Sequence, residues 1–296
     1  MASPCRIITD SDELAHSAER LVHQLESRWS RFRRTSEVTA VNDAAGHLVV
    51  VSALTARLFE LAEFARVATG GRFNPLMLDR LERLGYGSPD TSSDPSAAAR
   101  AAERPIENRP IDVLTEVSAV RLPAGSRFDP GGIGKGLAAD LVLDHLKSLG
   151  ARAAQIELGG DVRLWGENWT DQPWLVDVQD PRDRVGILTR LELAEGAIAT
   201  SSVLGHTWMV GDRSMHHLID PSTGQPSESD VLSVTTTSSE LWWAEVVAKV
   251  ALLAGSLMAP TVMRQFGCSG VVLVRDGTLV SVAADGSHEN MGELLR

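Results

Sequence analysis

The chain has only two cysteines, Cys5 and Cys268, which stand far apart without C-x-x-C or Cys/His spacing. This pattern argues against a disulfide framework and against a zinc site. Aromatic residues are also scarce, although seven tryptophans are present in the 296 residues. No internal repeat is found, so the length allows one large domain or two small ones.

Basic residues are outnumbered, with 28 Lys and Arg against 39 Asp and Glu and a net charge of −11. Because clustered basic side chains are needed to neutralise phosphates, we expect neither nucleic acid nor a membrane surface as a partner. The sequence has no apolar run of about 18 or more residues and no signal-peptide pattern at its N-terminus. The expected location is cytoplasmic. Because the net charge is negative, an anionic ligand would have to be bound by basic side chains or backbone amides gathered at one site.

Residues 126–140 combine four glycines with Lys135, directly before a predicted helix. The glycines are Gly131, Gly132, Gly134 and Gly136. Glycine allows positive φ and close approach of the backbone to a ligand, and the first amides of a helix lack intrahelical partners. With the charge of Lys135 added, this stretch predicts an anion site, most simply for phosphate.

Two phosphate fingerprints can be compared with this stretch. A Walker A loop is excluded, because Asp129 stands where its first glycine is needed and Gly136 where Ser or Thr is needed. A dinucleotide fingerprint fits in part, since residues 134–139 read G-x-G-x-x-A and Glu157 ends the next apolar run about 20 residues on. A glycine-rich turn that only lets a helix pack is the third interpretation.

The hydrophobic pattern predicts an α+β fold with largely antiparallel sheets, because short strands separated by turns outnumber βαβ crossovers. Residues 88–105, rich in Ser, Pro, Asp and Ala, are expected to form a mobile excursion within a single domain that spans 1–296. The predicted helices cover about 10–34, 53–68, 134–149 and 239–255. The predicted strands include 5–9, 111–122, 126–129, 154–158, 161–165, 173–178, 186–192, 197–200, 206–211, 215–219, 231–237 and the hairpin 271–282.

Ordered motifs along nearly the whole chain resemble those of the ApbE family of FAD-dependent protein flavinyltransferases. The resembling segments are Met1-Ala-Ser, Ser30-Arg-Phe, Ser36-Glu, Asn42, Thr69-Gly-Gly-Arg-Phe-Asn-Pro75, the loop from Asp129 to Asp140, Leu158-Gly-Gly-Asp161, Ala199-Thr-Ser201 and His217-Leu-Ile-Asp-Pro-Ser-Thr-Gly224. The resemblance implies a T-fold-like architecture with two lobes around a flavin cleft. It also implies transfer of FMN from FAD to a Ser or Thr of an acceptor protein, with release of AMP.

The resemblance also implies which residues contact FAD, the substrate. They are Met1, Phe32, Arg72, Phe73, Asn74, Asp129, Gly132, Lys135, Thr200, Ser201, His217, Leu218 and Ile219. Of these, Lys135 is expected beside the phosphates and His217 is the candidate base, because an imidazole has a suitable pKa near neutrality. In the family, Mg²⁺ is held partly by a backbone carbonyl, which here falls on Gly132.

The metal motif departs from the family pattern in the helix predicted over 239–255. Glu245 replaces an aspartate, and Lys249 replaces a threonine on the same helical face. A protonated lysine cannot bind Mg²⁺, and the longer glutamate moves its carboxylate within a tight octahedral site. We therefore expect the Lys249 ammonium to pair with Glu245 and to supply charge where the metal would lie, as a third catalytic candidate. Two further departures are Asn74 for an aspartate and Ser202 for a glycine.

The resemblance, together with these departures from it, implies three possible functions. The first is a flavinyltransferase with an altered metal requirement, the second an FAD-binding protein without turnover, and the third an FAD pyrophosphatase that gives FMN and AMP. The pair Glu245 and Lys249 argues against Mg²⁺-dependent catalysis and is compatible with binding alone.

Overall fold

The structure is a computed structural model that describes residues 4–86, 109–170, 172–183, 185–210, 212–283 and 288–290. Met1 and the excursion predicted over 88–105 lie outside the described residues. Within those ranges, no helix combines the length and the apolar character needed to cross a membrane.

The chain divides into two compact units. Of the described residues, the first unit comprises those within 25–131 and 205–228, and the second unit comprises those within 4–24, 132–204 and 229–290. The chain passes from one unit to the other within helix α1 (Asp12–Trp29) and again within the glycine loop, between Gly131 and Gly132. The glycine loop therefore contributes to both units.

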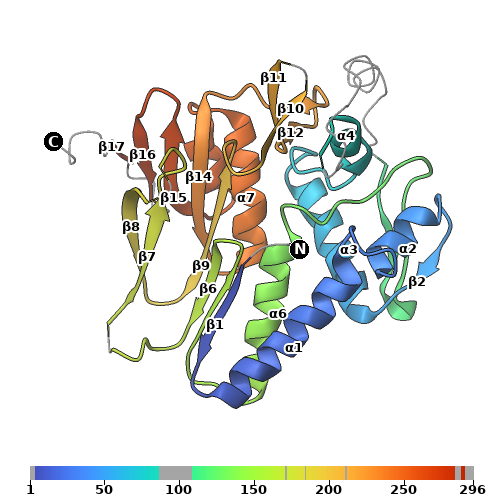
Figure 1. Ribbon diagram of the computed structural model, residues 1–296, viewed down its shortest axis with the longest axis horizontal. Helices are drawn as coiled ribbons and strands as arrows, with labels where there is room; N and C mark the ends of the chain where they lie inside the picture. Colours follow the sequence, from blue (N-terminus) through green and yellow to red (C-terminus); the bar gives the residue numbers. More distant parts are fainter. Residues whose placement is uncertain are drawn as a thin grey trace. The chain divides into compact units, whose positions relative to one another are not determined.

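The second unit is built on an eight-stranded sheet in the order β1-β5-β6-β9-β14-β15-β16-β17 (Figure 1). The strands are β1 (Cys5–Thr9), β5 (Ala154–Leu158), β6 (Asp161–Trp165), β9 (Gly196–Ser202), β14 (Val231–Ser238), β15 (Ser269–Val274), β16 (Leu279–Val282) and β17 (His288–Asn290). Each strand pair of this sheet that the structure describes runs antiparallel. This confirms the predicted sheet type and makes the dinucleotide interpretation wrong, because that fold needs parallel strands.

One face of this sheet carries the helices α6 (Gly134–Ser148) and α7 (Leu241–Ala254), and α8 (Ala259–Gln265) follows α7. Successive side chains of a strand point to opposite faces. Two side chains of β6 bind α6 accordingly, with Asp161 on Lys135 at 2.5 Å and Arg163 on Asp140 at 2.8 Å. This alternation fixes the start of α6 against the sheet.

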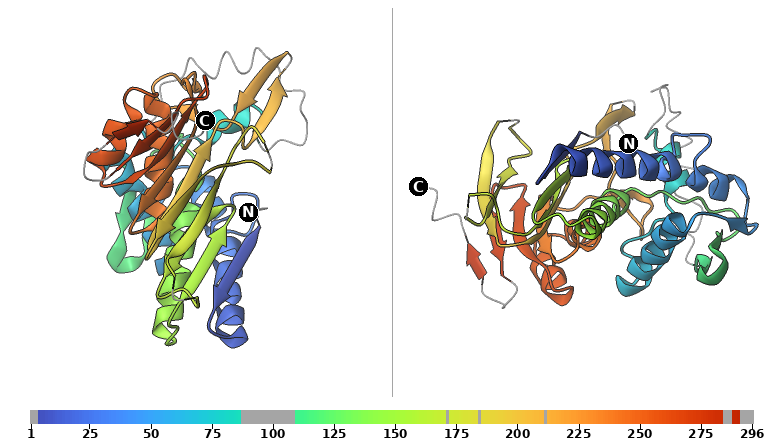
Figure 2. Two further views of the ribbon diagram at one scale, coloured as in Figure 1. Left: turned by 90° about the vertical axis from the view of Figure 1, so that its left-hand side faces the viewer. Right: turned by 90° about the horizontal axis from the view of Figure 1, so that it is seen from below.

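The intervening residues of β6 face a two-stranded hairpin, β7 (Trp174–Gln179) and β8 (Ile187–Leu193). Val162 and Leu164 form a buried cluster with Trp174. In Figure 2 the hairpin (yellow) lies on the side of the sheet away from α6 (green). Both faces of β6 are therefore covered.

The first unit combines short helices, a three-stranded sheet in the order β2-β4-β3 and two small hairpins. Its elements are α2 (Glu37–Asp43), β2 (Val49–Val50), α3 (Ala53–Ala68), α4 (Leu78–Arg83), β3 (Asp112–Leu114), the 3₁₀ turn η1 (Thr115–Val117), β4 (Ala119–Arg121), β10 (Thr207–Val210), β11 (Arg213–His216), β12 (Ile219–Asp220) and β13 (Gln225–Pro226).

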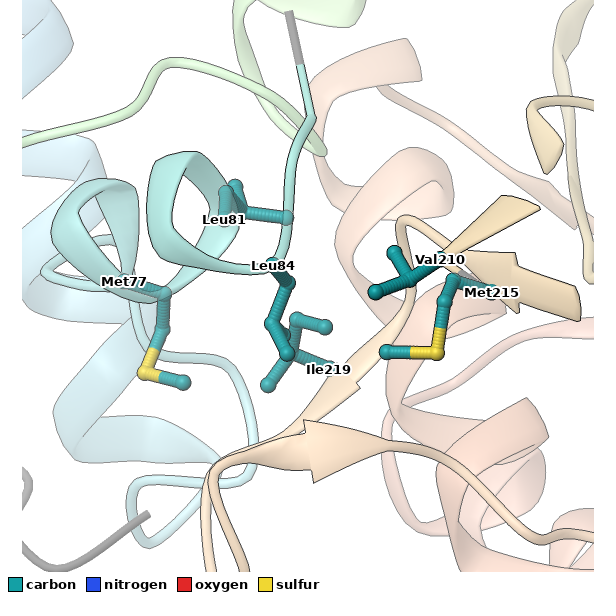
Figure 3. Close-up of a cluster of buried hydrophobic side chains, with 6 residues drawn as sticks. All are labelled: Met77, Leu81, Leu84, Val210, Met215 and Ile219. Atoms are coloured by element: carbon teal, nitrogen blue, oxygen red, sulfur yellow. The ribbon is translucent and has the colours of Figure 1, made fainter. Parts of the chain in front are cut away.

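Apolar side chains from α4 and from the hairpins form a common core in the first unit (Figure 3). The cluster consists of Met77, Leu81, Leu84, Val210, Met215 and Ile219. The indole nitrogen of Trp208 donates to the Leu84 carbonyl at 2.6 Å, which adds a polar contact beside this core. The chain segment around His217 is thus anchored to α4.

Several predicted elements are wrong. The strand predicted over 126–129 is irregular backbone, and the one predicted over 215–219 is divided between β11 and β12. The first long helix ends at Trp29 rather than near 34, and a separate helix α2 follows because Ser36 caps it by accepting a hydrogen bond from the Thr39 amide. The strand predicted over 111–122 is interrupted by η1 and by Ser118, whose φ of 47° is left-handed. Alternation of apolar residues alone does not reveal such a break, because a single left-handed residue ends strand geometry.

Candidate functional site

Helices α6 and α7 cap each other at their N-termini. Glu245 of α7 accepts a hydrogen bond from the Gly136 amide at 2.8 Å, and Asp140 of α6 accepts from the amides of Leu241 at 3.1 Å and Trp242 at 2.9 Å. Carboxylates at helix N-termini are favoured by the unpaired amides and by the helix dipole. Gly136 permits the close approach, since a Cβ there would lie 2.5 Å from the Trp242 Cα.

Lys135 lies between two carboxylates of the second unit. Its Nζ is 2.5 Å from Asp161 Oδ2 and 2.5 Å from Glu245 Oε1. The carboxylates are nearly buried, with 4% and 6% of their side chains exposed, whereas 25% of the lysine side chain is exposed. The other oxygen of Asp161 accepts from the Thr200 amide at 3.0 Å. This acid–lysine–acid cluster joins α6, α7 and the sheet.

The charge of Lys135 is stabilised by this arrangement. Burial opposes its ionisation, but attraction to Asp161 and to Glu245 outweighs that effect and raises the pKa of Lys135. Burial raises the pKa of Glu245, the charge of Asp161 acts in the same direction, and Lys135 and the Gly136 amide oppose it. Lys135 is therefore a permanent cation at neutral pH, close to the surface of the second unit.

The residues around Glu245 do not suit Mg²⁺. Both of its carboxylate oxygens are already engaged, one by Lys135 and one by the Gly136 amide. Nowhere in the described ranges do three or more His, Cys, Asp or Glu side chains gather as a metal-binding group. Since Mg²⁺ needs oxygen ligands in near-octahedral geometry, and a lysine cannot supply one, this donor set favours an ammonium over a divalent ion.

Lys249 follows Glu245 by one turn of α7 and is partly buried. The ammonium group that the structure shows beside Glu245 belongs to Lys135 of α6. Pairing of Lys249 with Glu245, as expected from their spacing, stays a prediction.

His217 lies in the first unit, between β11 and β12, within a cluster of rings. The ring of Tyr86 stacks on it with centroids 6.1 Å apart and 25° between planes, and the ring of His206 meets it edge-on at 5.1 Å and 87°. Tyr86 is the single tyrosine of the chain and also contacts Trp208, at 5.3 Å. These contacts orient the imidazole that the sequence proposes as a base.

Asp129 is positioned by hydrogen bonds within the first unit. The side-chain amide of Asn42 donates to the Phe128 carbonyl at 3.0 Å and accepts from the Phe128 amide at 2.7 Å, and the Asp129 amide donates to the Pro75 carbonyl at 2.8 Å. Asn42 thus forms hydrogen bonds with both the amide and the carbonyl of Phe128, as a residue of a neighbouring strand would do. The segment before the glycine loop is held without being a strand.

Arg31 is a candidate that the sequence did not reveal. Residues 28–34 look like a solvated helix end, but only 7% of the Arg31 side chain is exposed, while its neighbour Phe32 is 62% exposed. The Nε of Arg31 lies 3.3 Å from Asp129 Oδ1. The sequence does contain one sign of a role in binding: Arg31 lies inside the Ser30-Arg-Phe motif, next to Phe32, a predicted FAD contact.

The predicted FAD contacts thus fall into two groups, one in each unit. Phe73, Leu218 and Ile219 have buried side chains, so contact with a ligand would be through their backbone. Asn74 is also buried, and its Oδ1 accepts from the Leu76 amide at 2.9 Å. Arg72 is exposed, and Ser201 is partly buried, next to Thr200 on β9.

Comparison with known proteins places these features in a family. An ApbE family model matches residues 1–271. An FAD:protein FMN transferase of Klebsiella pneumoniae is 29% identical over 249 residues, which cover 81% of this chain and 76% of that protein. An FAD:protein FMN transferase of Vibrio cholerae is 28% identical over 254 residues, covering 84% and 75%.

Solved structures give the same fold. An ApbE protein from Thermotoga maritima superposes with a TM-score of 0.83 at 24% identity, covering 95% of this chain and 94% of that one. The flavin transferase ApbE from Vibrio cholerae gives 0.80 at 24% identity, covering 96% and 95%. The predicted fold class is confirmed by these likenesses. Since the family match extends over most of the sequence, the chain belongs to the ApbE family.

Proposed function

We propose that this protein is an FAD:protein FMN transferase, which moves FMN from FAD to a Ser or Thr of an acceptor protein and releases AMP. The observation that carries the proposal is the match, over four fifths of the chain, to proteins named for this activity. The acid–lysine–acid cluster and the ring cluster around His217 add side chains of the kinds that the reaction needs.

The reaction exchanges one phosphorus–oxygen bond for another. The hydroxyl oxygen of the acceptor attacks the phosphorus on the FMN side, the bond from that phosphorus to the bridging oxygen breaks, and AMP leaves with the bridging oxygen. The hydroxyl proton passes to a base, for which His217 is the candidate. Catalysis of phosphoryl transfer consists mainly of positioning and of stabilising negative charge.

Lys135 is the group proposed to stabilise that charge. An ammonium fixed by two carboxylates is already oriented, so little reorganisation is needed when the leaving phosphate gains charge. With both oxygens of Glu245 engaged, we propose that AMP release needs no divalent ion. Lys249 is proposed as a second amine near Glu245, and its replacement by methionine tests this separately.

A second candidate function is FAD binding without turnover. The engagement of both Glu245 oxygens favours it, because the same contacts that exclude a metal also remove a carboxylate from chemistry. FAD hydrolysis to FMN and AMP is a third outcome, in which water replaces the acceptor hydroxyl.

The test is to incubate the purified protein with FAD, in EDTA or in Mg²⁺, and to follow AMP and FMN by chromatography. An extract of the producing cells is added as the source of acceptor, and covalent flavin is detected by fluorescence in denaturing gels. We expect AMP in both media, with covalent flavin only when extract is present, and loss of both signals in His217→Ala. FMN and AMP without covalent flavin would indicate hydrolysis.

Absence of AMP in either medium, despite binding of FAD, would contradict the transferase proposal and support the binding function. AMP only with Mg²⁺ would contradict the proposed role of Lys135. The cytoplasmic location is likewise a proposal, to be checked by cell fractionation, and the acceptor is proposed to present its Ser or Thr on an accessible segment.

A further inference from the structure

Arg31 has a buried donor that no side chain or backbone group of the described residues satisfies. Its side chain is 7% exposed, and its Nη2 has no hydrogen-bond partner among the described residues. Leaving a buried guanidinium donor unpaired is costly, and such groups are rare in folded proteins. The arrangement suits a residue whose partner arrives with a ligand.

The rest of the guanidinium contacts acidic and aromatic side chains of the first unit. Its Nε lies 3.3 Å from Asp129 Oδ1 and its Nη1 lies 3.8 Å from Glu82 Oε1. The guanidinium carbon lies 4.2 Å from the centroid of the Phe32 ring and 5.2 Å from that of Tyr86. Because the guanidinium is planar and its donors have a fixed geometry, these contacts also fix Nη2.

Asp129 offers a matching acceptor. Its Oδ1 faces Arg31, while its Oδ2 makes no hydrogen bond to any residue that the structure describes, and the side chain is 14% exposed. An available donor and an available acceptor therefore belong to two residues that are linked to each other through Nε and Oδ1. This pair can bind a group that presents an acceptor next to a donor.

The local charge indicates a neutral group rather than a phosphate. Asp129 and Glu82 already compensate the charge of Arg31, and Glu82 also pairs with Arg127. A phosphate at Nη2 would meet the Asp129 carboxylate at close range, which is unfavourable because like charges repel. A heterocycle edge with a ring nitrogen or carbonyl beside an N–H avoids this, and its ring can stack on the neighbouring aromatic side chains.

We propose that Arg31 and Asp129 together bind the hydrogen-bonding edge of one ring of FAD, with Arg31 Nη2 donating and Asp129 Oδ2 accepting. The inference rests on the proposed function, which makes FAD the substrate, and it assigns Arg31 as a substrate-binding residue. Two rings of FAD carry this chemistry: the isoalloxazine, with N3–H between two carbonyls, and the adenine, with N1 beside the amino group. The shared feature is an acceptor adjacent to a donor.

The experiment measures binding of FAD, FMN and AMP by calorimetry to the wild type and to Arg31→Met and Arg31→Lys. Loss of a hydrogen bond to a charged donor predicts binding of FAD weaker by about 10- to 100-fold in Arg31→Met. Arg31→Lys keeps the charge without the planar fork and is expected to bind FAD more weakly than the wild type as well. Arg33→Met is the matched control, because Arg33 is 52% exposed, pairs with Glu26 and should leave all affinities unchanged.

The fragments identify the ring. Weaker FMN binding with unchanged AMP binding assigns the isoalloxazine, and the reverse assigns the adenine. Analogues then test Asp129: N3-methylriboflavin lacks the flavin N–H, and IMP has a carbonyl where AMP has its amino group, so the relevant analogue should bind about 10-fold or more weakly than its parent. Thermal melting of each variant identifies any that does not fold.

Folded Arg31 variants that bind FAD like the wild type would overturn the inference and leave the proposed function standing. Equal losses of affinity for FMN and for AMP would also overturn the inference, because the proposed pair binds the edge of one ring and only one of the two fragments carries that ring. A wild-type protein that binds no FAD would overturn the proposed function itself, and the inference with it.

Discussion

Replacing Lys135 by methionine should destabilise the second unit strongly. The change removes the ammonium that lies 2.5 Å from both Asp161 and Glu245, and it leaves two carboxylates that are 4% and 6% exposed. Removing one partner of a buried ion pair costs about 3–5 kcal/mol, because the remaining charge stays buried without compensation. Since a quarter of the Lys135 side chain reaches solvent, we expect a loss near the lower end, about 3 kcal/mol.

The assay is urea unfolding at pH 7, followed by circular dichroism, with Lys147→Met as the matched control. Lys147 is exposed on the same helix, and its ammonium lies 4.7 Å from the centroid of the Trp165 ring, so its replacement should lower the free energy of unfolding by no more than about 1 kcal/mol. Replacing both carboxylates as well, by Asp161→Asn and Glu245→Gln, should restore much of the loss, because no charge is then left buried.

The pH dependence follows from the sign of the shift. The pKa of Lys135 is raised in the folded state, so its stabilising contribution is fully present at pH 7 and is lost only as the pH rises through the folded value. In Lys135→Met the loss of stability relative to the wild type should shrink as the pH falls, because burial raises the pKa of Glu245 and its protonation leaves one buried charge fewer. Equal stability of the variant and the wild type at pH 7 would refute the reasoning.

Three further predictions concern stability and are measured by the same urea titrations. Gly136→Ala should cost about 1–3 kcal/mol, because the added Cβ would collide with the α7 backbone; an unchanged midpoint would show that the two helices can separate. Glu37→Gln should cost about 1–2 kcal/mol at pH 7 and progressively less in acid. Burial opposes ionisation of Glu37, but hydrogen bonds from Thr55 and Ser52 lower its pKa overall, so its contribution is fully present above the ordinary value and is lost as the pH falls through the lowered one. A cost that does not diminish as the pH falls would contradict this. Leu84→Ala, at a fully buried position of the α4 core, should cost about 2–5 kcal/mol, and a smaller loss would mean that the core collapses around the gap.

Local signals predicted much of the fold. The helix predicted over 53–68 is present, because Ser52 caps its start by accepting from the Thr55 amide, and it ends before Thr69 as predicted. The Asp276-Gly277 turn joins two paired strands as its sequence indicates. These elements were predictable because their determinants lie within a few residues of one another.

The contact between Glu245 and Lys135 was not predictable in the same way. Spacing along one helix points to Lys249, a pairing that stays a prediction, and gives no sign of Lys135, which is 110 residues away and comes from α6. That contact depends on the close approach of α6 and α7 at Gly136, which is a property of packing rather than of local pattern. Arg31 was missed for a similar reason, since its burial depends on Asp129 and Tyr86, both distant in sequence.

The reciprocal capping of α6 and α7 by each other's carboxylates has a consequence for folding. The first turn of each helix obtains a hydrogen-bond acceptor only from the body of the other, so neither N-terminus is complete while its neighbour is absent. Formation of the two ends is therefore a single event that joins segments about a hundred residues apart, and closing so long a loop is slow. The lysine proposed to act on FAD becomes ordered only when that event has occurred.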